Sequence, residues 1–163
     1  AGKCARFSES VLRPMGRAAH GVIGMRLDEG QSVISLIVTN DEQKYVLAAT
    51  EHGYGKRTRI GEYSVQNRGG QGLKTYQITQ KTGEIVGAKK VTGEEDILLV
   101  SDDGTIIRME AGGISLLGRA TQGVRLMRPA EGAHVVAMAR TEREASEEET
   151  AEPGESAVEI TEE

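Results

Sequence analysis

Short apolar runs alternate with polar, glycine-containing turns along most of the chain. Apolar runs at 45–50 and 97–101 are each followed by a polar turn that ends in glycine, at Gly53 and Gly104, and then by a second short run. Glycine adopts positive φ without a steric penalty, so this pattern indicates β-hairpins. Two further apolar runs follow in each unit, at 22–27, 73–78 and 124–127, and at 33–38, 85–88 and 135–138. The pattern predicts four short strands in each unit.

The units recur at a fixed period of 51 residues, marked by the pentamer Arg-x-x-x-Gly that begins at Arg17, Arg68 and Arg119. A second arginine stands 11 residues before each pentamer, at Arg6, Arg57 and Arg108. Four-stranded repeats of about 40–50 residues are typical of the radial blades of propeller-like folds. Helical periodicity is weak throughout, which disfavours helical solenoids and α/β folds.

We therefore predict an all-β fold, a β-pinwheel or propeller-like array of four-stranded antiparallel blades. Its repeats are expected at about 1–40, 41–93 and 94–141. The first repeat begins at its hairpin turn, so the chain is predicted to be a piece of a longer protein with two full blades and most of a third. Three blades do not close a ring, and the strand edges left open are expected to favour self-association.

Charge divides the chain into two parts. Residues 142–163 hold ten glutamates and one arginine, whereas residues 1–141 hold 19 lysines and arginines against 15 acidic residues. A segment of low hydrophobicity and like charge cannot offset the entropy lost on ordering. The sequence predicts a mildly basic folded body at 1–141 and a disordered acidic tail at 142–163.

Catalytic chemistry has no recurrent candidate in this sequence. The three histidines, His20, His52 and His134, lack Cys or carboxylate neighbours at ligand spacing, and Cys4 reads as a small core residue. No apolar run is long enough to span a bilayer. We expect no catalytic residue, no metal and no cofactor in this chain.

Basic residues are the recurrent polar feature, and in a radial fold a basic residue that repeats becomes a row of charge around a rim. Such a row suits the regularly spaced phosphates of duplex nucleic acid. Aromatic residues are scarce, which argues against a single-stranded partner because single strands need stacking platforms. The candidate nucleic-acid contacts are Arg13, Arg17, Lys56, Arg57, Arg59, Arg68, Lys74, Arg119 and Arg125, with Arg128 beside them.

Two interpretations of the repeated arginines remain open. Arg6, Arg57 and Arg108 fall within the second strand of each hairpin, so they either contact nucleic acid or hold neighbouring blades together. Arg17, Arg68 and Arg119 lie in polar, glycine-flanked loops, and there the contact with nucleic acid is the favoured interpretation. The glycines after Arg68 are also expected to offer backbone N–H groups to phosphate.

One stretch resembles a known family. Gln66, Arg68, Gly69, Gly70 and Gly72 match five of the seven positions of Gln-Arg-Arg-Gly-Gly-Lys-Gly, the box motif in the C-terminal domain of DNA gyrase A. The surroundings, at 6–13, 53–58 and 118–123, are similar to the C-terminal half of that domain. The resemblance covers residues 1 to about 140. Asn67 and Gln71 replace two basic residues of the motif, so this copy resembles a degenerate corner rather than the principal box.

The resemblance implies a β-pinwheel whose blades exchange strands and whose basic rim wraps double-stranded DNA. It implies a non-catalytic module that supports ATP-dependent negative supercoiling by a bacterial, cytoplasmic, nucleoid-associated gyrase. The partners it implies are the rest of the gyrase A polypeptide and the ATPase B subunit in an A2B2 assembly, with ATP and Mg acting elsewhere in the parent enzyme. Two alternatives remain, a protein-binding propeller fragment and the related C-terminal domain of the A-type polypeptide of topoisomerase IV.

Overall fold

The computed structural model describes residues 1–143, and within them the chain forms nine strands and three single-turn 3-10 helices. The strands are β1 (Lys3–Cys4), β2 (Tyr45–Thr50), β3 (Tyr54–Arg59), β4 (Leu73–Lys74), β5 (Ile85–Val91), β6 (Asp96–Ser101), β7 (Ile106–Glu110), β8 (Val124–Arg125) and β9 (Val135–Thr141). The 3-10 helices are η1 (Glu9–Val11), η2 (Ile60–Glu62) and η3 (Ala111–Gly113). No helix in this part of the chain has the length and apolar character needed to cross a membrane.

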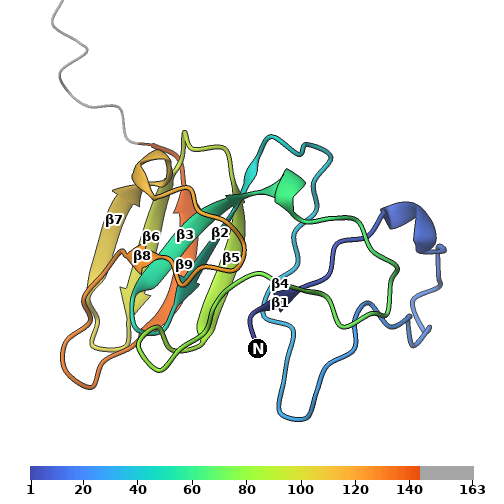
Figure 1. Ribbon diagram of the computed structural model, residues 1–163, viewed down its shortest axis with the longest axis horizontal. Helices are drawn as coiled ribbons and strands as arrows, with labels where there is room; N and C mark the ends of the chain where they lie inside the picture. Colours follow the sequence, from blue (N-terminus) through green and yellow to red (C-terminus); the bar gives the residue numbers. More distant parts are fainter. Residues whose placement is uncertain (144–163) are drawn as a thin grey trace, which may run out of the picture.

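The strands form three antiparallel sheets, one for each repeat, and these lie side by side (Figure 1). Their strand orders are β1-β4, β5-β2-β3-β8 and β7-β6-β9. The second and third sheets are at the left of Figure 1, and the first repeat, with its long loops, is at the right. The all-β fold of antiparallel repeats predicted from the sequence is confirmed.

Neighbouring repeats exchange their third strand. In the second repeat, β2 and β3 form a hairpin in which Ala48 lies opposite Lys56, and β5 pairs along the other side of β2. The outer edge of β3 is covered by β8, which comes from the third repeat and places Arg125 opposite Tyr54. In the same way, β4 of the second repeat pairs with β1 of the first. Each of these two sheets is thus completed by the repeat that follows it in the sequence.

The residues that follow the exchanged strand β8 pack against Gly53, the glycine of the β2–β3 hairpin turn. The Gly53 carbonyl accepts hydrogen bonds from the Leu126 and Met127 amides at 2.8 and 3.1 Å. Gly53 has φ of +77°, and a Cβ built on it would lie 2.2 Å from the Met127 carbonyl oxygen. Both the positive φ and the close backbone approach require glycine at this turn.

The core lies between the second and third sheets. It contains Leu47 of β2, Ile97 and Leu99 of β6, and Val135 of β9, all nearly or fully buried. The intervening residue of β6, Leu98, is only half-buried, because successive side chains of a strand point to opposite faces. The alternation of burial therefore fixes which face of each sheet packs against its neighbour.

Some predicted strands are shorter or missing. The runs 22–27 and 33–38 form no strand, and the runs 73–78 and 124–127 pair over only two residues each. A β-strand exists only where a second strand pairs with it, and the described part of the chain offers no partner strand to 22–27 or 33–38. The sheets accordingly contain two, four and three strands rather than four each. The predicted acidic tail lies, from residue 144 onward, outside the described residues.

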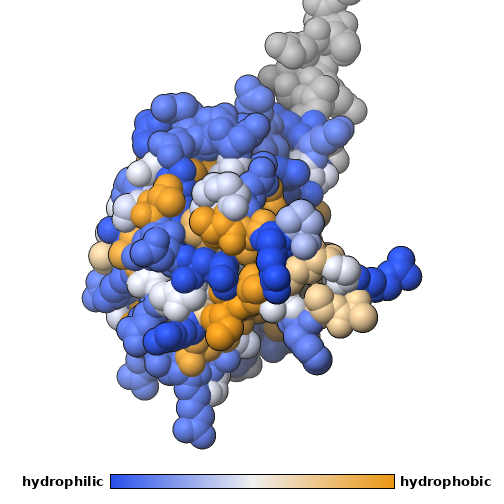
Figure 2. All heavy atoms as spheres, turned by 90° about the vertical axis from the view of Figure 1, so that its right-hand side faces the viewer, coloured by the Kyte–Doolittle hydropathy of each residue, from blue (hydrophilic) through white to orange (hydrophobic). Residues whose placement is uncertain are grey.

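The unpaired runs leave apolar side chains at the surface of the first repeat. Figure 2 views the molecule from that side and shows an apolar band flanked by polar side chains. Most of the exposed large apolar residues lie between positions 11 and 38, and they include Val22, Ile23, Leu36 and Val38.

Candidate nucleic-acid interface

The exchanged strands carry basic side chains on the outer edge of the sheets. Lys74 on β4 and Arg125 on β8 occupy equivalent positions, 51 residues apart, and both are exposed. Lys3 lies opposite Lys74 in the β1–β4 pair and is exposed as well. Equivalent positions of the second and third repeats therefore carry exposed cations on the exchanged strands, an arrangement that suits phosphate recognition.

Tyr54 organises a small basic cluster at the start of β3. The Arg125 guanidinium lies 4.6 Å from the Tyr54 ring centre, and its Nη2 donates a hydrogen bond of 2.5 Å to the Tyr54 hydroxyl. The Lys81 ammonium lies 5.5 Å from the same ring. Cation–π contact orients long side chains without removing their charge. Tyr54 thus holds two cations in place.

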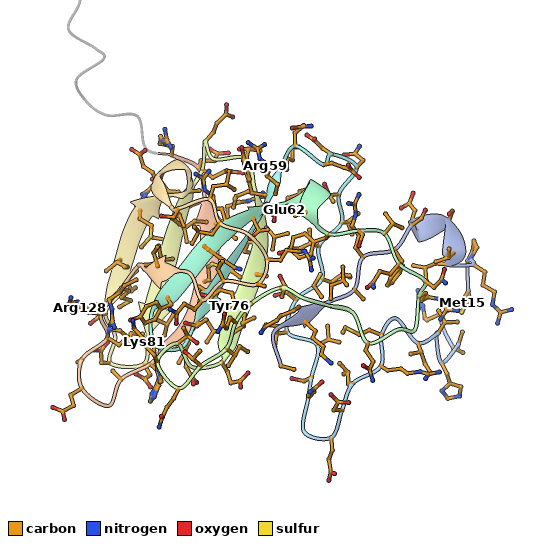
Figure 3. The ribbon with its side chains drawn as sticks, in the orientation of Figure 1. Met15, Arg59, Glu62, Tyr76, Lys81 and Arg128 are labelled. Carbon is orange, nitrogen blue, oxygen red and sulfur yellow. The ribbon has the colours of Figure 1, made fainter. Side chains whose placement is uncertain are left out.

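Lys81 was not among the residues predicted from the sequence. Figure 3 shows Lys81 and Arg128 at the same end of the molecule, at the lower left. Both are exposed. The equivalent positions in the other repeats are Gly30 and Gly132, so the repeat pattern gave no signal for Lys81. Only the folded structure brings its charge to Arg125.

Lys56 requires a correction, because its side chain is buried. Its ammonium donates hydrogen bonds to the Gly118 and Arg119 carbonyls, at 2.7 and 2.5 Å, and to the Thr121 hydroxyl at 3.1 Å. Burial lowers the pKa of Lys56 to about 8. The negative charge of Glu62 raises this pKa by a smaller amount, and the positive charge of Arg119 lowers it slightly further. Lys56 therefore fastens the loop of the following repeat, and we remove it from the candidate DNA contacts.

The arginines of the hairpin strands reach forward to the next repeat. Arg57 donates from Nε to the Ile114 carbonyl at 2.8 Å and from Nη2 to the Gly112 carbonyl at 2.6 Å. Arg6 makes the equivalent contact, from Nη1 to the Tyr63 carbonyl at 2.8 Å. Of the two interpretations left open, the geometry at Arg6 and Arg57 favours the one in which they hold blades together.

The arginines of the pentamers reach back to the preceding repeat. Arg68 donates to the Ile23 carbonyl at 2.5 Å, and Arg119 donates to the Lys74 carbonyl at 3.0 Å. Both side chains are half-buried. Arg17, the equivalent residue of the first repeat, is exposed, as is Arg13. Arg68 and Arg119 each donate one N–H group to the backbone of the neighbouring repeat. A guanidinium has five N–H donors, so each side chain has further donors besides that one.

The box-like motif is packed against the first repeat. The Gly69 amide donates to the Gly24 carbonyl at 2.8 Å, and the Gly70 carbonyl accepts from the Arg26 amide at 2.8 Å. The Gln66 amide donates to the Arg6 carbonyl at 2.7 Å. The expectation that this stretch offers free N–H groups to phosphate is therefore wrong for Gly69, since its amide already has an acceptor.

Arg59 lies apart from the basic cluster. It is exposed at the far end of β3 from Tyr54, and its guanidinium lies 5.6 Å from the Tyr45 ring (Figure 3). Arg57 approaches the same ring at 5.0 Å. Arg59 is thus a separate exposed cation on the same strand.

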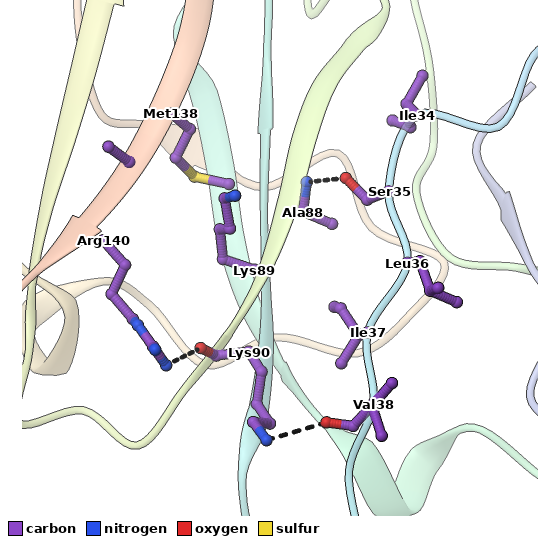
Figure 4. A pocket seen from close by; sticks show the side chains of 11 residues that line it. Ile34, Ser35, Leu36, Ile37, Val38, Ala88, Lys89, Lys90, Met138 and Arg140 are labelled. Atoms are coloured by element: carbon purple, nitrogen blue, oxygen red, sulfur yellow. Dashed lines mark hydrogen bonds between the residues drawn. The ribbon is translucent and has the colours of Figure 1, made fainter.

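The opposite edge of the sheets lines a groove of about 660 Å³. Residues 34–38, β5 and β9 lie next to one another there (Figure 4). Cations fasten these inner segments: Lys90 donates to the Val38 carbonyl at 2.9 Å, and Arg140 donates to the Lys90 carbonyl at 3.1 Å. Lys89 in the same groove is exposed. β5 and β8 are at opposite edges of one sheet. The groove is therefore separate from the outer basic row, the name used here for Lys74, Arg125 and the cations next to them.

Metal-binding clusters of three or more His, Cys, Asp or Glu side chains do not occur within residues 1–143. His52 and His134 lie near each other, with ring centres 5.6 Å apart, and each has an acidic neighbour, Glu51 and Asp102. The sequence did not anticipate that these two histidines from different repeats would meet.

Comparison with known proteins matches all three repeats to one family. The sequence profile described as "DNA gyrase C-terminal domain, beta-propeller" matches residues 1–40, 44–92 and 95–142. The A subunit of DNA gyrase from Staphylococcus epidermidis is 51% identical over 140 residues, which are 85% of this chain and 16% of that protein. The Staphylococcus aureus protein of the same name is 47% identical over 144 residues, 88% of this chain and again 16% of the relative. The chain therefore spans 16% of the length of these relatives.

Two solved structures share the fold. A DNA gyrase A C-terminal domain superposes with a TM-score of 0.73 at 30% identity, covering 86% of this chain and 47% of that one. A C-terminal domain of DNA topoisomerase IV superposes with a TM-score of 0.80 at 23% identity, covering 86% and 44%. At that lower identity, the second likeness speaks for the fold alone.

Proposed function

We propose that this chain, which belongs to the family of DNA gyrase C-terminal β-propeller domains, is a non-catalytic module that binds and wraps double-stranded DNA. The observation that carries the proposal is the recurrence of exposed cations on the exchanged outer strands, Lys74 and Arg125. Lys3 and Lys81 extend the same basic row. Of the residues proposed from the sequence, Arg13, Arg17, Arg59, Arg68 and Arg119 remain candidate contacts.

Wrapping rather than straight binding is supported by the arrangement of the repeats. A duplex that follows a row of cations around successive blades has to bend, and bending 20–30 base pairs by 40–90° costs on the order of 1–6 kcal/mol. Several phosphate contacts on each blade offset that cost. Affinity built on phosphate contacts falls steeply with salt, because bound counterions are released.

We further propose that the parent protein is the A subunit of an ATP-dependent DNA gyrase, a cytoplasmic type II topoisomerase that introduces negative supercoils. Its nucleophile, its Mg site and the ATPase B subunit of an A2B2 assembly would lie outside this chain. Identities of 46–51% to gyrase A proteins favour gyrase over topoisomerase IV. Supercoiling assays on the parent with its ATPase partner separate the two, since relaxed DNA converted to negatively supercoiled DNA identifies gyrase.

A salt titration of duplex binding tests the DNA interface. Each phosphate contact contributes about −0.9 to the slope of log K against log salt, so K74Q/R125Q should flatten the slope by about two units. K89Q is the matched control, because Lys89 is an exposed cation in the inner groove. Equal slopes for the two variants would refute the outer row. A slope near zero for the unmodified chain would favour the protein-binding alternative.

A further inference from the structure

We propose that Lys56 positions a DNA contact without touching DNA: its buried ammonium holds residues 117–123 of the third repeat, the third corner, so that Arg119 meets a phosphate. Lys56 is thus a positioning residue. The inference rests on the proposed DNA interface and names what fixes one of its contacts. It concerns the junction of the second and third repeats, and every residue that it invokes lies in the described part of the chain.

The Lys56 ammonium has as many hydrogen-bond donors as the third corner offers it acceptors. It donates to the Gly118 carbonyl at 2.7 Å, to the Arg119 carbonyl at 2.5 Å and to the Thr121 hydroxyl at 3.1 Å. The Thr121 hydroxyl donates its own hydrogen to the Gly118 carbonyl at 2.9 Å, so it accepts from Lys56. An ammonium has three donors, and all three are used on the third corner. Lys56 therefore fixes the two peptide groups that flank Arg119, and with them the direction in which the Arg119 side chain leaves the backbone.

Other groups of the second repeat bind neighbouring carbonyls of the third corner. The hydrogen bonds run from the Thr58 hydroxyl to the Leu117 carbonyl at 2.8 Å, from the Gln77 amide to the Thr121 carbonyl at 3.0 Å, and from the Tyr76 hydroxyl to the Gln122 carbonyl at 2.7 Å. The Tyr76 ring also lies 4.9 Å from the Lys56 ammonium. The second repeat thus holds the backbone on both sides of Arg119.

The equivalent junction of the first and second repeats lacks this polar arrangement. At the positions of Lys56, Thr58 and Tyr76, the first repeat has Ala5, Phe7 and Met25. Apolar side chains are therefore enough to seat a corner, whereas burying a lysine cation costs free energy. Packing alone does not call for Lys56, and its directional hydrogen bonds point to a role in orienting what the third corner carries.

The third corner carries Arg119 to the outer basic row. The Arg119 Nη1 donates to the Lys74 carbonyl at 3.0 Å, and the Lys74 side chain is an exposed cation of that row. A guanidinium has five N–H donors, so Arg119 has others with which to bind a phosphate beside Lys74. An arginine whose backbone is already fixed loses less conformational entropy on binding than a mobile one. Without Lys56, that entropy would be lost at the moment of DNA binding.

Charge couples Lys56 to the same contact. Burial is the main cause that lowers the pKa of Lys56 to about 8, while Glu62 raises this pKa and the Arg119 guanidinium lowers it. A phosphate bound to Arg119 offsets the guanidinium charge, so the pKa of Lys56 should rise in the complex. Duplex binding then takes up a proton, and by linkage the affinity falls as pH rises through about 8. Three other titratable groups lie around this junction, and burial raises the pKa of each: Cys4, Tyr63 and Tyr76.

A salt titration of duplex binding tests the role of Lys56. Fluorescence anisotropy with a labelled duplex gives Kd at each salt concentration for the 163-residue chain and its variants. K56M and R119Q should each raise Kd about tenfold at about 0.1 M salt and flatten the slope of log K against log salt by about one unit, because each removes the same phosphate contact. K56M/R119Q should bind no more weakly than R119Q, since Lys56 acts through Arg119.

R57Q is the matched control for K56M. Arg57 is the next residue of β3, and it binds the Gly112 and Ile114 carbonyls, which lie outside the third corner. R57Q also removes bonds between these two repeats, so it shows what a loss of stability alone does to DNA binding. We expect it to leave the salt slope unchanged.

The pH dependence of binding separates a positioning role from a purely structural one. In a C4S background, which removes the Cys4 thiol, the rise in Kd between about pH 7 and 9.5 should be about two- to threefold larger than in C4S/K56M. The titration midpoint of the Lys56 Nζ, followed by NMR, should move to higher pH when duplex is added. This measurement uses the unmodified lysine, so it decides the matter even if K56M does not fold.

The possible outcomes distinguish this inference from the DNA interface on which it rests. A chain that does not bind duplex at low salt would refute the interface and the role of Lys56 together. Duplex binding with a steep salt slope, but with the same slope in K56M, would overturn the role of Lys56 alone. Additive effects of K56M and R119Q, equal flattening by R57Q, or an unmoved Lys56 midpoint would overturn it as well.

Discussion

Replacing Gly53 with alanine tests how much the exchanged strand contributes to stability. The new Cβ would lie 2.2 Å from the Met127 carbonyl oxygen, so β8 and the residues after it must move away from β3. Alanine at φ of +77° costs about 1–2 kcal/mol by itself. Displacing the strand also weakens the hydrogen bonds from the Leu126 and Met127 amides, at about 0.5–1.5 kcal/mol each. We expect G53A to lower the free energy of unfolding by about 2–5 kcal/mol.

Gly132 provides the matched control for this substitution. Its φ is +79°, but no described atom lies within 4 Å of an added Cβ. G132A should therefore carry only the cost of the positive φ, about 1–2 kcal/mol. Urea unfolding followed by circular dichroism, with all proteins at one concentration, gives the two values. Amide exchange at Leu126 and Met127 should accelerate in G53A alone. Equal destabilisation by the two substitutions, with unchanged exchange at these amides, would refute the importance of the exchanged strand.

Three further predictions concern the contacts between repeats. The pKa of Lys56 is about 8 in the folded state and near 10.5 when unfolded, so the unfolded chain binds more protons between these values and stability should rise with pH there. The unmodified chain should gain about 1–2 kcal/mol over K56M between about pH 7.5 and 9.5, measured by urea unfolding; a parallel pH dependence would contradict this. R57Q should lower the free energy of unfolding by about 2 kcal/mol and leave the salt slope of DNA binding unchanged, because its guanidinium bonds to backbone carbonyls; a flattened slope would make it a phosphate contact. Y76F removes the bond from the Tyr76 hydroxyl to the Gln122 carbonyl, 2.7 Å long, and should cost about 1 kcal/mol in the same assay; a stability equal to that of the unmodified chain would show that this bond contributes nothing.

The repeat and its hairpins could be predicted from the sequence because they depend on local signals. Apolar runs on either side of a glycine turn specify β2 and β3, and the same pattern specifies β6 and β7. The run 22–27 carries the same signals but forms no strand, since pairing depends on a partner that no local pattern describes. Strand ends are likewise set by the partner, so the run at 73–78 pairs only over Leu73–Lys74.

The candidate DNA contacts also divide into those that local sequence signals identify and those that only the folded structure identifies. The position of Lys74 and Arg125 on an outer strand predicts that both are exposed. The clustering of basic residues in β3 does not by itself predict that Lys56 is buried. Strand alternation gives the missing signal, since Lys56 and Thr58 face the buried side while Arg57 and Arg59 face the other. The carbonyls bound by Arg57 and Arg68 belong to other repeats, and only the folded structure identifies them.

Strand exchange has a consequence for the order in which a ribosome delivers this fold. Tyr54 meets Arg125 only after 71 further residues have been synthesised. At about 5–20 residues per second, the hairpin of one repeat waits roughly 4–14 s before its outer strand emerges. During that interval the edge of β3 is open to other nascent chains. Each newly made repeat therefore protects the one before it, and the speed of translation sets how long every hairpin remains exposed.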